Sequence, residues 1–352
     1  MFSNKIEKNI TDLLKIISSS EFNTYLVGGC LRDLILGNTP KDLDILVEDE
    51  IDAFSKFLSK SLNSKIIKFQ NHGFETFRII NSKTKLNIDI TAYSGGNDGL
   101  INDLSMRDFT INSMASSLNN EKFDFENILD PFNGLQDLNN HVIRYISKDL
   151  VLNDPLRLLR SIRLASKLNF DIEQDTKKHF MNNSEKINSV SHERIRDEII
   201  DIFVLDNSFN YLSLMEDMNL LNQIFPEMEL SKGVIQGGLH DKDIYMHSLA
   251  TLFFIENIIN ENLFPEISLN NNIFAHENTI IPYIKLAAFF HDIGKPDTKS
   301  FSQSRIRFIS HEEHGSTISK NITNRLKFSM KVQKYISSLI KNHLRLGHLI
   351  SL

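Results

Sequence analysis

The chain has 352 residues, more than the roughly 250–300 at which a single hydrophobic core stops growing, so two or three domains are expected. Its composition, 41% hydrophobic and 24% charged residues, is ordinary for a globular protein and excludes a disordered or fibrous chain. The net charge of −6 excludes a uniformly basic coat, although residues 301–352 carry +7. This C-terminal charge fits either a nucleic-acid surface or a solvated helical face.

Cysteine content and hydropathy indicate the compartment. Cys30 is the only cysteine, which excludes an internal disulfide, and its apolar neighbours favour a packed rather than a reactive thiol. No stretch reaches the ~18 apolar residues of a membrane span, and the N-terminus lacks the apolar core of a signal peptide. We therefore expect a cytoplasmic protein without a membrane partner.

The first 145 residues mix helices and strands. Apolar residues at helical period predict a helix over 5–18, and TYLV predicts a strand that ends in paired glycines. A helix over 31–37, a strand over 43–47 and a helix over 52–62 follow, and then strands at FRII and LNIDITAYS. These elements include too few βαβ repeats for a doubly wound sheet.

Beyond Asp149 the strand signals nearly vanish, and apolar periodicity predicts helices over 155–168, 192–204 and 208–221. Pro and Gly interrupt the pattern near residues 225–238. The sequence therefore predicts an α+β protein with a head (1–145) built on a small mixed sheet with helices, an all-α neck (146–225) and a helical domain (226–352).

Two acids share one face of a predicted strand. Asp42 and Asp44 lie at i and i+2 in KDLDILV, so both carboxylates project to the same side. A divalent cation between them would remove their repulsion, and hard oxygen ligands favour Mg²⁺. Asp89, on the strand LNIDITAYS, could join them. By itself, however, this short pattern also fits two solvent-facing acids at a strand end.

A glycine pair precedes these acids. Gly28 and Gly29 leave backbone N–H groups uncovered at a helix start, where a triphosphate could bind, and Arg32 lies in the first turn of that helix. The same pair also fits a plain turn between strand and helix.

These segments together resemble a known family. LVGGCLRDLILGNTPKDLDILVED is similar to the signature of class II tRNA nucleotidyltransferases and bacterial poly(A) polymerases. The resemblance continues in order through DLSMRDFTINSMA, DPFNGLQDL, NDPLRLLRSIRLA and SHERIRDEI, over about residues 22–200. It implies a polymerase-β-like head and transfer of nucleotides to RNA 3′ ends without a template.

The resemblance also implies residue roles in the head. Asp42 and Asp44 would bind two Mg²⁺ ions at the catalytic centre, and Asp89 could join them there as a third acid. The triphosphate would be bound at the turn by Gly28, Gly29 and Arg32, and the nucleotide's sugar and phosphates by Arg107 and Asp108.

The segment NDPLRLLRSIRLA carries a row of arginines. Arg157, Arg160 and Arg163 recur at i+3 steps and lie on one helical face. The resemblance implies that Asp154 and Arg157 read the base edge of CTP or ATP while Arg160 and Arg163 contact phosphates. An aspartate accepts from the exocyclic amines of cytosine and adenine while an arginine donates to their ring acceptors, so uracil and guanine should be rejected. Alternatively, Asp154 caps the helix and the arginines are solvated.

In SHERIRDEI, Glu193 and Arg194 are candidates for orienting the nucleotide-binding residues, or else form an exposed ion pair.

Histidines near the C-terminus resemble those of an HD domain, in which His and Asp residues from separate helices bind a divalent metal for phosphate-ester hydrolysis. The alternative is a helical scaffold for the tRNA body with a polar cluster in its core. The candidate ligands of this second metal site are His247, His291, Asp292 and either His311 or His343, while His314 lies nearby in HEEHG.

The predicted function is the transfer of CMP, and of AMP in a complete CCA addition, from CTP and ATP to the 3′ end of tRNA. Arg107 follows Asp89 by only 18 positions, a short spacing that is typical of CC-adding relatives. A poly(A) polymerase and an HD phosphohydrolase with an RNA-binding N-terminal half are the alternatives. The oligomeric state is left open.

Overall fold

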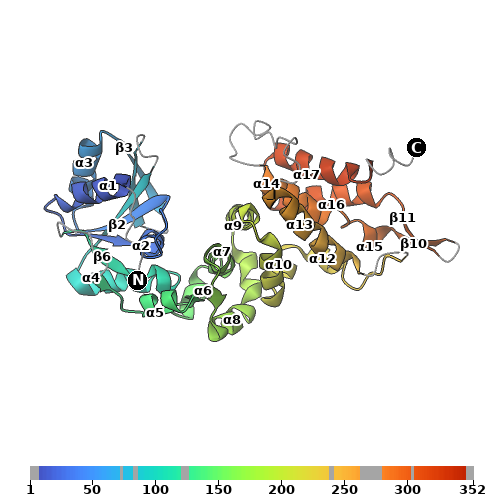
Figure 1. Ribbon diagram of the computed structural model, residues 1–352, viewed down its shortest axis with the longest axis horizontal. Coiled ribbons are helices and arrows are strands. Elements are labelled where there is room, and N and C mark those ends of the chain that lie inside the picture. Colours follow the sequence, from blue (N-terminus) through green and yellow to red (C-terminus); the bar gives the residue numbers. More distant parts are fainter. Residues whose placement is uncertain are drawn as a thin grey trace. The chain divides into compact units, whose positions relative to one another are not determined.

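The protein is described by a computed structural model that covers residues 8–71, 74–81, 86–119, 127–237, 242–261, 280–302 and 305–345. The chain divides into two compact units, Met1–Leu150 and Val151–Leu352 (Figure 1). A further division near residue 225 stays a prediction. Among the described residues, no helix has both the length and the apolar character needed to cross a membrane.

A mixed sheet of seven strands forms the first unit, in the order β3-β4-β5-β2-β1-β6-β7. Only β2 and β5 pair in parallel, and the other neighbours are antiparallel, as expected for a head that is not doubly wound. The strands are β1 (Thr24–Val27), β2 (Asp42–Glu48), β3 (Lys65–Asn71), β4 (Phe74–Ile80), β5 (Asn87–Tyr93), β6 (Ala115–Ser117) and β7 (Ile128–Leu129).

Helices cover this sheet, and the short strand β8 (Val142–Ile143) lies outside it. Leu46 of β2 and Tyr93 of β5 pack with Leu100 and Leu104 in one buried cluster, so a helix covers the sheet face that also carries Asp44. The helices are α1 (Lys8–Ser18), α2 (Gly28–Ile35), α3 (Ile51–Leu62), α4 (Gly96–Ser105), the 3₁₀ turn η1 (Thr110–Asn112) and α5 (Gly134–Asn139). The first residues of the predicted helix 5–18 lie outside the described residues. Strand β3 was not predicted, because KIIKFQN lacks clear alternation.

The second unit is mainly helical. The helix α7 packs on α9 and α10, and α14 packs on α9, α13 and α17. The elements are α6 (Asp149–Asn153, which begins just before the unit), α7 (Arg157–Leu168), β9 (Asp171–Ile172), α8 (Gln174–Met181), the 3₁₀ helix η2 (Ser184–Ser189), α9 (His192–Val204), α10 (Ser208–Asp217), α11 (Leu220–Ile224), α12 (Pro226–Glu229), α13 (Ile244–Asn260), α14 (Ile281–Phe290), α15 (Lys295–Thr298), α16 (His311–Arg325) and α17 (Met330–Asn342).

Two features of this unit correct the predictions. The helix expected over 208–221 ends at Asp217, because Asn219 adopts a left-handed φ of 57° before α11 begins. The region after Asp149 is not wholly helical, since β10 (Lys299–Ser302) and β11 (Arg305–Phe308) form an antiparallel hairpin. Four-residue strands are too short for their alternation to stand out in the sequence.

Candidate functional site

Three carboxylates meet on one face of the sheet. Asp42 and Asp44 alternate along β2 with the buried residues Leu43 and Ile45, which fixes the acids on the opposite face. In the parallel pairing of β2 with β5, Asp44 lies directly opposite Asp89. Residues in register project to the same side, so the structure brings all three predicted acids together.

The environment of Asp44 fits a divalent cation. Burial raises the pKa of its carboxyl from 3.8 to about 6; Asp89 and Asp42 push it in the same direction, and Arg107 opposes them. Asp42 accepts a hydrogen bond of 2.8 Å from the Asn87 amide. Ionisation of Asp44 is therefore less favourable than usual, and a cation between the carboxylates would stabilise its ionised form.

Arg78 is a functional candidate that the sequence reasoning missed. It lies opposite Asp89 in the antiparallel β4–β5 pair. Its Nε and Nη2 donate to the two carboxylate oxygens of Asp89, at 2.7 and 2.6 Å. The only signal in the sequence was an arginine within the predicted strand FRII. Since both oxygens of Asp89 accept from this guanidinium, Asp42 and Asp44 are the better-placed metal ligands.

The turn at Gly28 brings an arginine to the acids. Gly28 has a φ of 74°, and a Cβ there would lie 2.9 Å from Nη1 of Arg107 and 3.0 Å from Oδ2 of Asp44. Any other residue would both strain the turn and separate these groups. Arg107 is oriented by Asp103, whose Oδ2 accepts from its Nε and Nη2 at 3.0 and 2.9 Å.

Arg32 and Asp108 lie in a buried network beneath this turn. Arg32 is only 4% exposed and donates from Nη1 to Asn112 (2.6 Å) and from Nε to Asp33 (2.8 Å). The Asn112 amide in turn donates to Asp108 at 2.9 Å. A Cβ on Gly29 would lie 3.3 Å from Nη2 of Arg32, so the guanidinium packs directly under the glycine pair. Arg32 thus supports the turn, and its contact with a triphosphate stays a prediction.

Only one carboxylate oxygen of Asp154 has a hydrogen-bond partner among the described residues. Its Oδ2 accepts a hydrogen bond of 2.9 Å from Nη2 of Arg194 on α9. Its Oδ1 is buried and has no hydrogen-bond partner among the described residues. The residue that caps α7 is Leu156, without a side-chain cap, so the capping role considered for Asp154 is not observed. A buried acceptor without a partner is costly unless a ligand satisfies it.

The predicted arginine row lies along α7. Arg157, Arg160 and Arg163 are all partly buried, between positions that are buried in the core. Arg163 donates from Nε to Glu198 of α9 at 2.6 Å. Glu198 was not predicted, because the sequence does not show which helix packs against α7. Since the acids belong to the first unit and this row to the second, their sharing of one nucleotide site stays a prediction.

The five predicted ligands of the second metal site come together around Asp292. Its Oδ2 lies 3.4 Å from Nε2 of His247 and 3.1 Å from that of His291. Its Oδ1 lies 3.3 Å from Nε2 of His311 and 3.7 Å from that of His343. The sequence left His311 and His343 as alternatives, but the structure places both in the cluster.

Backbone contacts orient these imidazoles. Nδ1 of His291, His311 and His343 lies 2.9, 2.7 and 2.7 Å from a backbone carbonyl oxygen, which favours a proton on Nδ1 and a lone pair on Nε2. With Nδ1 facing the backbone, Nε2 of each of these imidazoles faces the carboxylate of Asp292, so imidazole nitrogens and carboxylate oxygens lie together where a metal ion could bind. His314 lies outside the cluster and pairs with Asp297 at 2.8 Å.

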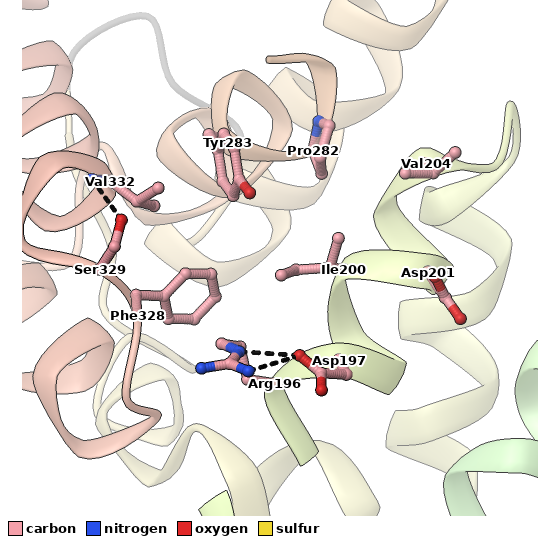
Figure 2. A pocket seen from close by; sticks show the side chains of 10 residues that line it. All are labelled: Arg196, Asp197, Ile200, Asp201, Val204, Pro282, Tyr283, Phe328, Ser329 and Val332. Carbon is pink, nitrogen blue, oxygen red and sulfur yellow. Dashed lines mark hydrogen bonds and ion pairs between the residues drawn. The ribbon is translucent and has the colours of Figure 1, made fainter. Parts of the chain in front are cut away.

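A pocket of about 420 Å³ lies between α9 and the helices α14 and α17 of the same unit (Figure 2). Ile200, Tyr283 and Phe328 give it an apolar lining, and Arg196 at its rim is paired with Asp197. None of the predicted site residues lines it.

Three family models match consecutive parts of the chain. Residues 24–144 match the poly(A) polymerase head domain, and 169–231 match the probable RNA- and SrmB-binding site of polymerase A. Residues 244–349 match the HD domain.

Individual relatives agree with these matches. The chain is 26% identical over 329 residues to a CC-adding tRNA nucleotidyltransferase of Thermus thermophilus, covering 92% of this chain and 68% of the relative. It is 32% identical over 241 residues to a CCA-adding enzyme of Staphylococcus epidermidis, covering 65% of this chain and 58% of the relative. The chain thus spans between about half and two thirds of the length of such curated relatives.

The fold is also that of a solved relative. The structure of the Thermotoga maritima CCA-adding enzyme complexed with tRNA superposes with a TM-score of 0.69 at 23% identity, covering 99% of this chain and 73% of that one.

Proposed function

Since the chain combines the head domain and RNA-binding region of the poly(A) polymerase family with an HD domain, we propose that it is a nucleotidyltransferase that extends the 3′ end of tRNA. It transfers CMP, and AMP if the addition is complete, from CTP and ATP with release of pyrophosphate. The observation that carries the proposal is the pair Asp42 and Asp44 on one face of β2, beside Arg107 and the Gly28 turn. The similarity to the CC-adding enzyme of Thermus and the CCA-adding enzyme of Staphylococcus supports it.

In this proposal Asp42 and Asp44 hold two Mg²⁺ ions, which oxygen-only ligands favour. When bound, such ions lower the pKa of the attacking 3′-hydroxyl and neutralise charge on the departing pyrophosphate. The backbone N–H groups at Gly28 and Gly29 bind the triphosphate, and Arg107 adds a positive charge beside the same acids. Asp108 would assist at the nucleotide's sugar.

In this proposal, Asp154 and Arg157 select the nucleotide that is added. Oδ1 of Asp154 is the acceptor that remains, and it suits an exocyclic amine, which cytosine and adenine have and uracil lacks. Arg194 holds the other oxygen and thereby fixes the direction of the carboxylate. Arg160 and Arg163 would face the phosphates.

The proposal is tested by incubating purified protein with Mg²⁺ and a tRNA that ends before CCA, using each triphosphate alone and then all four. We expect CMP incorporation, with none from UTP or GTP. Asp44→Asn is the matched control: it should abolish incorporation and leave tRNA binding intact in a gel-shift assay. Failure to incorporate any nucleotide would contradict the proposal.

The same assay separates the closest alternatives. The short segment between Asp89 and Arg107 favours addition of two C residues and no A. Addition of C, C and then A would identify a complete CCA-adding enzyme instead. A long A tail from ATP alone would identify a poly(A) polymerase.

The cluster around Asp292 supports a second candidate function, hydrolysis of phosphate esters at a divalent metal in the HD domain. Its test is release of p-nitrophenol from bis(p-nitrophenyl) phosphate after loading with Co²⁺, Ni²⁺ or Mg²⁺. We expect Asp292→Ala to lose this activity and Asp44→Asn to keep it. Equal hydrolysis by Asp292→Ala and the wild type would rule the cluster out.

A further inference from the structure

The hairpin formed by β10 and β11 carries positive charge without a carboxylate partner. Lys299, Arg305 and Arg307 are exposed, and the two strands contain no acid. Within the part of the chain that the structure describes, none of the three forms an ion pair. By contrast, Arg163 and Arg325 each pair with a glutamate of a neighbouring helix. The charge of the hairpin is therefore available to an anionic partner.

The register of the hairpin sorts these side chains onto two faces. Arg307 lies opposite Ser300, so Arg305, two positions away, shares this face with both. The two arginines are about 6.6–6.8 Å apart along the strand, which is comparable with the separation of successive phosphates in a nucleic-acid chain. Lys299 and Phe301 alternate with Ser300 and project from the other face. One side of the ribbon thus offers two guanidinium groups, and the other offers an ammonium group and an aromatic ring.

Phe301 is 74% exposed, and Nζ of Lys299 lies 5.9 Å from the centroid of its ring. An exposed aromatic ring among cations is the arrangement on which unpaired bases stack in proteins that bind RNA. A merely solvated basic surface has no need of such a ring. The combination therefore favours a nucleic acid over other anionic partners.

The hairpin projects from the helices of the second unit, and its base is held in place (Figure 1). A Cβ on Gly237 would lie 3.5 Å from Cδ1 of Ile306, so this side chain packs on the preceding segment. The backbone carbonyl of Phe308 lies 2.7 Å from Nδ1 of His311, at the start of α16. The arginines and the ring of Phe301 are thereby presented from a fixed support.

We propose that the β10–β11 hairpin is an RNA-binding surface, additional to the residues assigned to nucleotide addition. Its three cations contact phosphates, and Phe301 stacks on an unpaired base. Contacts with phosphates carry no sequence information, so the hairpin should add affinity for the RNA without affecting which nucleotide is added. The inference rests on the proposed function for the identity of this RNA as tRNA.

The first experiment measures the affinity of the full chain for fluorescein-labelled tRNA lacking CCA, by fluorescence anisotropy between 50 and 200 mM salt. We expect the triple variant Lys299→Gln, Arg305→Gln and Arg307→Gln to raise the Kd about tenfold at 100 mM salt. The slope of log Kd against log salt concentration should fall by about 2–3, because three phosphate contacts are lost.

The matched control removes the same charge from three exposed lysines on or between α16 and α17, through Lys320→Gln, Lys327→Gln and Lys334→Gln. It should change the Kd by less than about twofold. Equal losses in the two triple variants would overturn the proposal, because net charge alone would then explain the binding.

The second experiment tests the aromatic ring. Phe301→Leu retains an apolar side chain and should raise the Kd about fivefold without changing the salt dependence, since stacking involves no phosphate. A photoreactive p-benzoylphenylalanine in place of Phe301 should crosslink to the tRNA. The same replacement of Phe254, which is 63% exposed on α13, is the control and should not. Crosslinking at neither position, or equally at both, would overturn the stacking role.

These results can be separated from those for nucleotide addition. If the wild type adds CMP and the triple hairpin variant binds tRNA as tightly as the wild type, the hairpin inference alone is overturned. If the wild type adds no nucleotide but the hairpin variant loses RNA binding, the proposed function fails and the RNA-binding surface stands.

Discussion

Asp44 contacts several parts of the head. Its carboxylate lies beside Asp89, its Oδ2 approaches the Gly28 turn, and its backbone N–H donates to the Cys30 thiol at 3.2 Å. The Cys30 thiol also donates to the Val27 carbonyl at 2.9 Å, and burial raises the pKa of this thiol. Cys30 is therefore packed, as predicted, and its hydrogen bonds connect β2 to the turn.

The pKa of Asp44 leads to a prediction about stability without metal. Because folding raises this pKa from 3.8 to about 6, the ionised carboxylate costs stability above pH 6, and the cost disappears as the pH falls below about 4. We expect Asp44→Asn in EDTA at pH 7.5 to raise the free energy of unfolding by about 1–3 kcal/mol, and to have no effect at pH 4.

Urea denaturation followed by circular dichroism at both pH values measures this difference. Mg²⁺ should stabilise the wild type and not the variant, since a ligand stabilises only the fold that binds it. Asp12→Asn, at an exposed position of α1, is the control. Destabilisation by Asp44→Asn at pH 7.5 in EDTA would contradict the account.

At the scale of elements, the packing of α9 against α7 determines how the candidate base-reading residues are held. Arg194 extends from α9 to Asp154, and Glu198, one turn further along α9, accepts from Arg163. Both α7 and α9 were predicted from apolar period, and α9 has the predicted bounds. Their pairing came only from the structure.

A substitution of Arg194 tests whether its contact with Asp154 orients the candidate base-reading residues. We expect Arg194→Ala to raise the KM for CTP at least tenfold and to reduce the preference for CTP over UTP, because Asp154 loses the partner that orients it. Single-nucleotide kinetics on a tRNA lacking CCA would measure both values. Arg196→Ala is the matched control on the same helix, since Arg196 contacts Asp197 and the Lys327 carbonyl instead. An equal loss in both variants would mean that the effect is structural.

At the scale of the whole molecule, a buried ion pair connects the start of α10 to the later helices α13 and α14 of the second unit. Lys285 of α14 and Glu256 of α13 lie 3.0 Å apart with side chains 1% and 4% exposed. Glu256 also accepts from the backbone N–H groups of Ser208 and Phe209, and Lys285 donates to the Leu205 carbonyl. The start of α10 is thereby fixed to α13 and α14 in one unit.

We expect Lys285→Met to lower the free energy of unfolding by about 3–5 kcal/mol, because Glu256 would remain buried without its counter-ion. Lys285→Met with Glu256→Gln should recover much of this loss, since an amide oxygen can still accept from the start of α10. Urea denaturation measures both. The exposed pair of Lys341 and Glu313 provides the control, and Lys341→Ala should change stability by less than about 1 kcal/mol. If Lys285→Met lowered the free energy of unfolding by no more than about 1 kcal/mol, the buried pair would not be needed for stability.

The sequence by itself determined the features that depend on local period. Strand alternation placed Asp42 and Asp44 on one face, the glycine pair marked the turn at the start of α2, and helical spacing aligned the arginines of α7. Each of these follows from backbone geometry over a few residues, which is independent of the rest of the fold.

Only the tertiary structure showed which of these strand and helix faces contact one another. It brought Arg78 to Asp89, Arg194 to Asp154, and His311 together with His343 to Asp292. Strand register and helix packing depend on side chains distant in sequence, and no period in a single segment encodes them. For this reason the acids and the histidines could be predicted as ligands, whereas the presence of both His311 and His343 beside Asp292 and the partners that orient Asp89 and Asp154 could not.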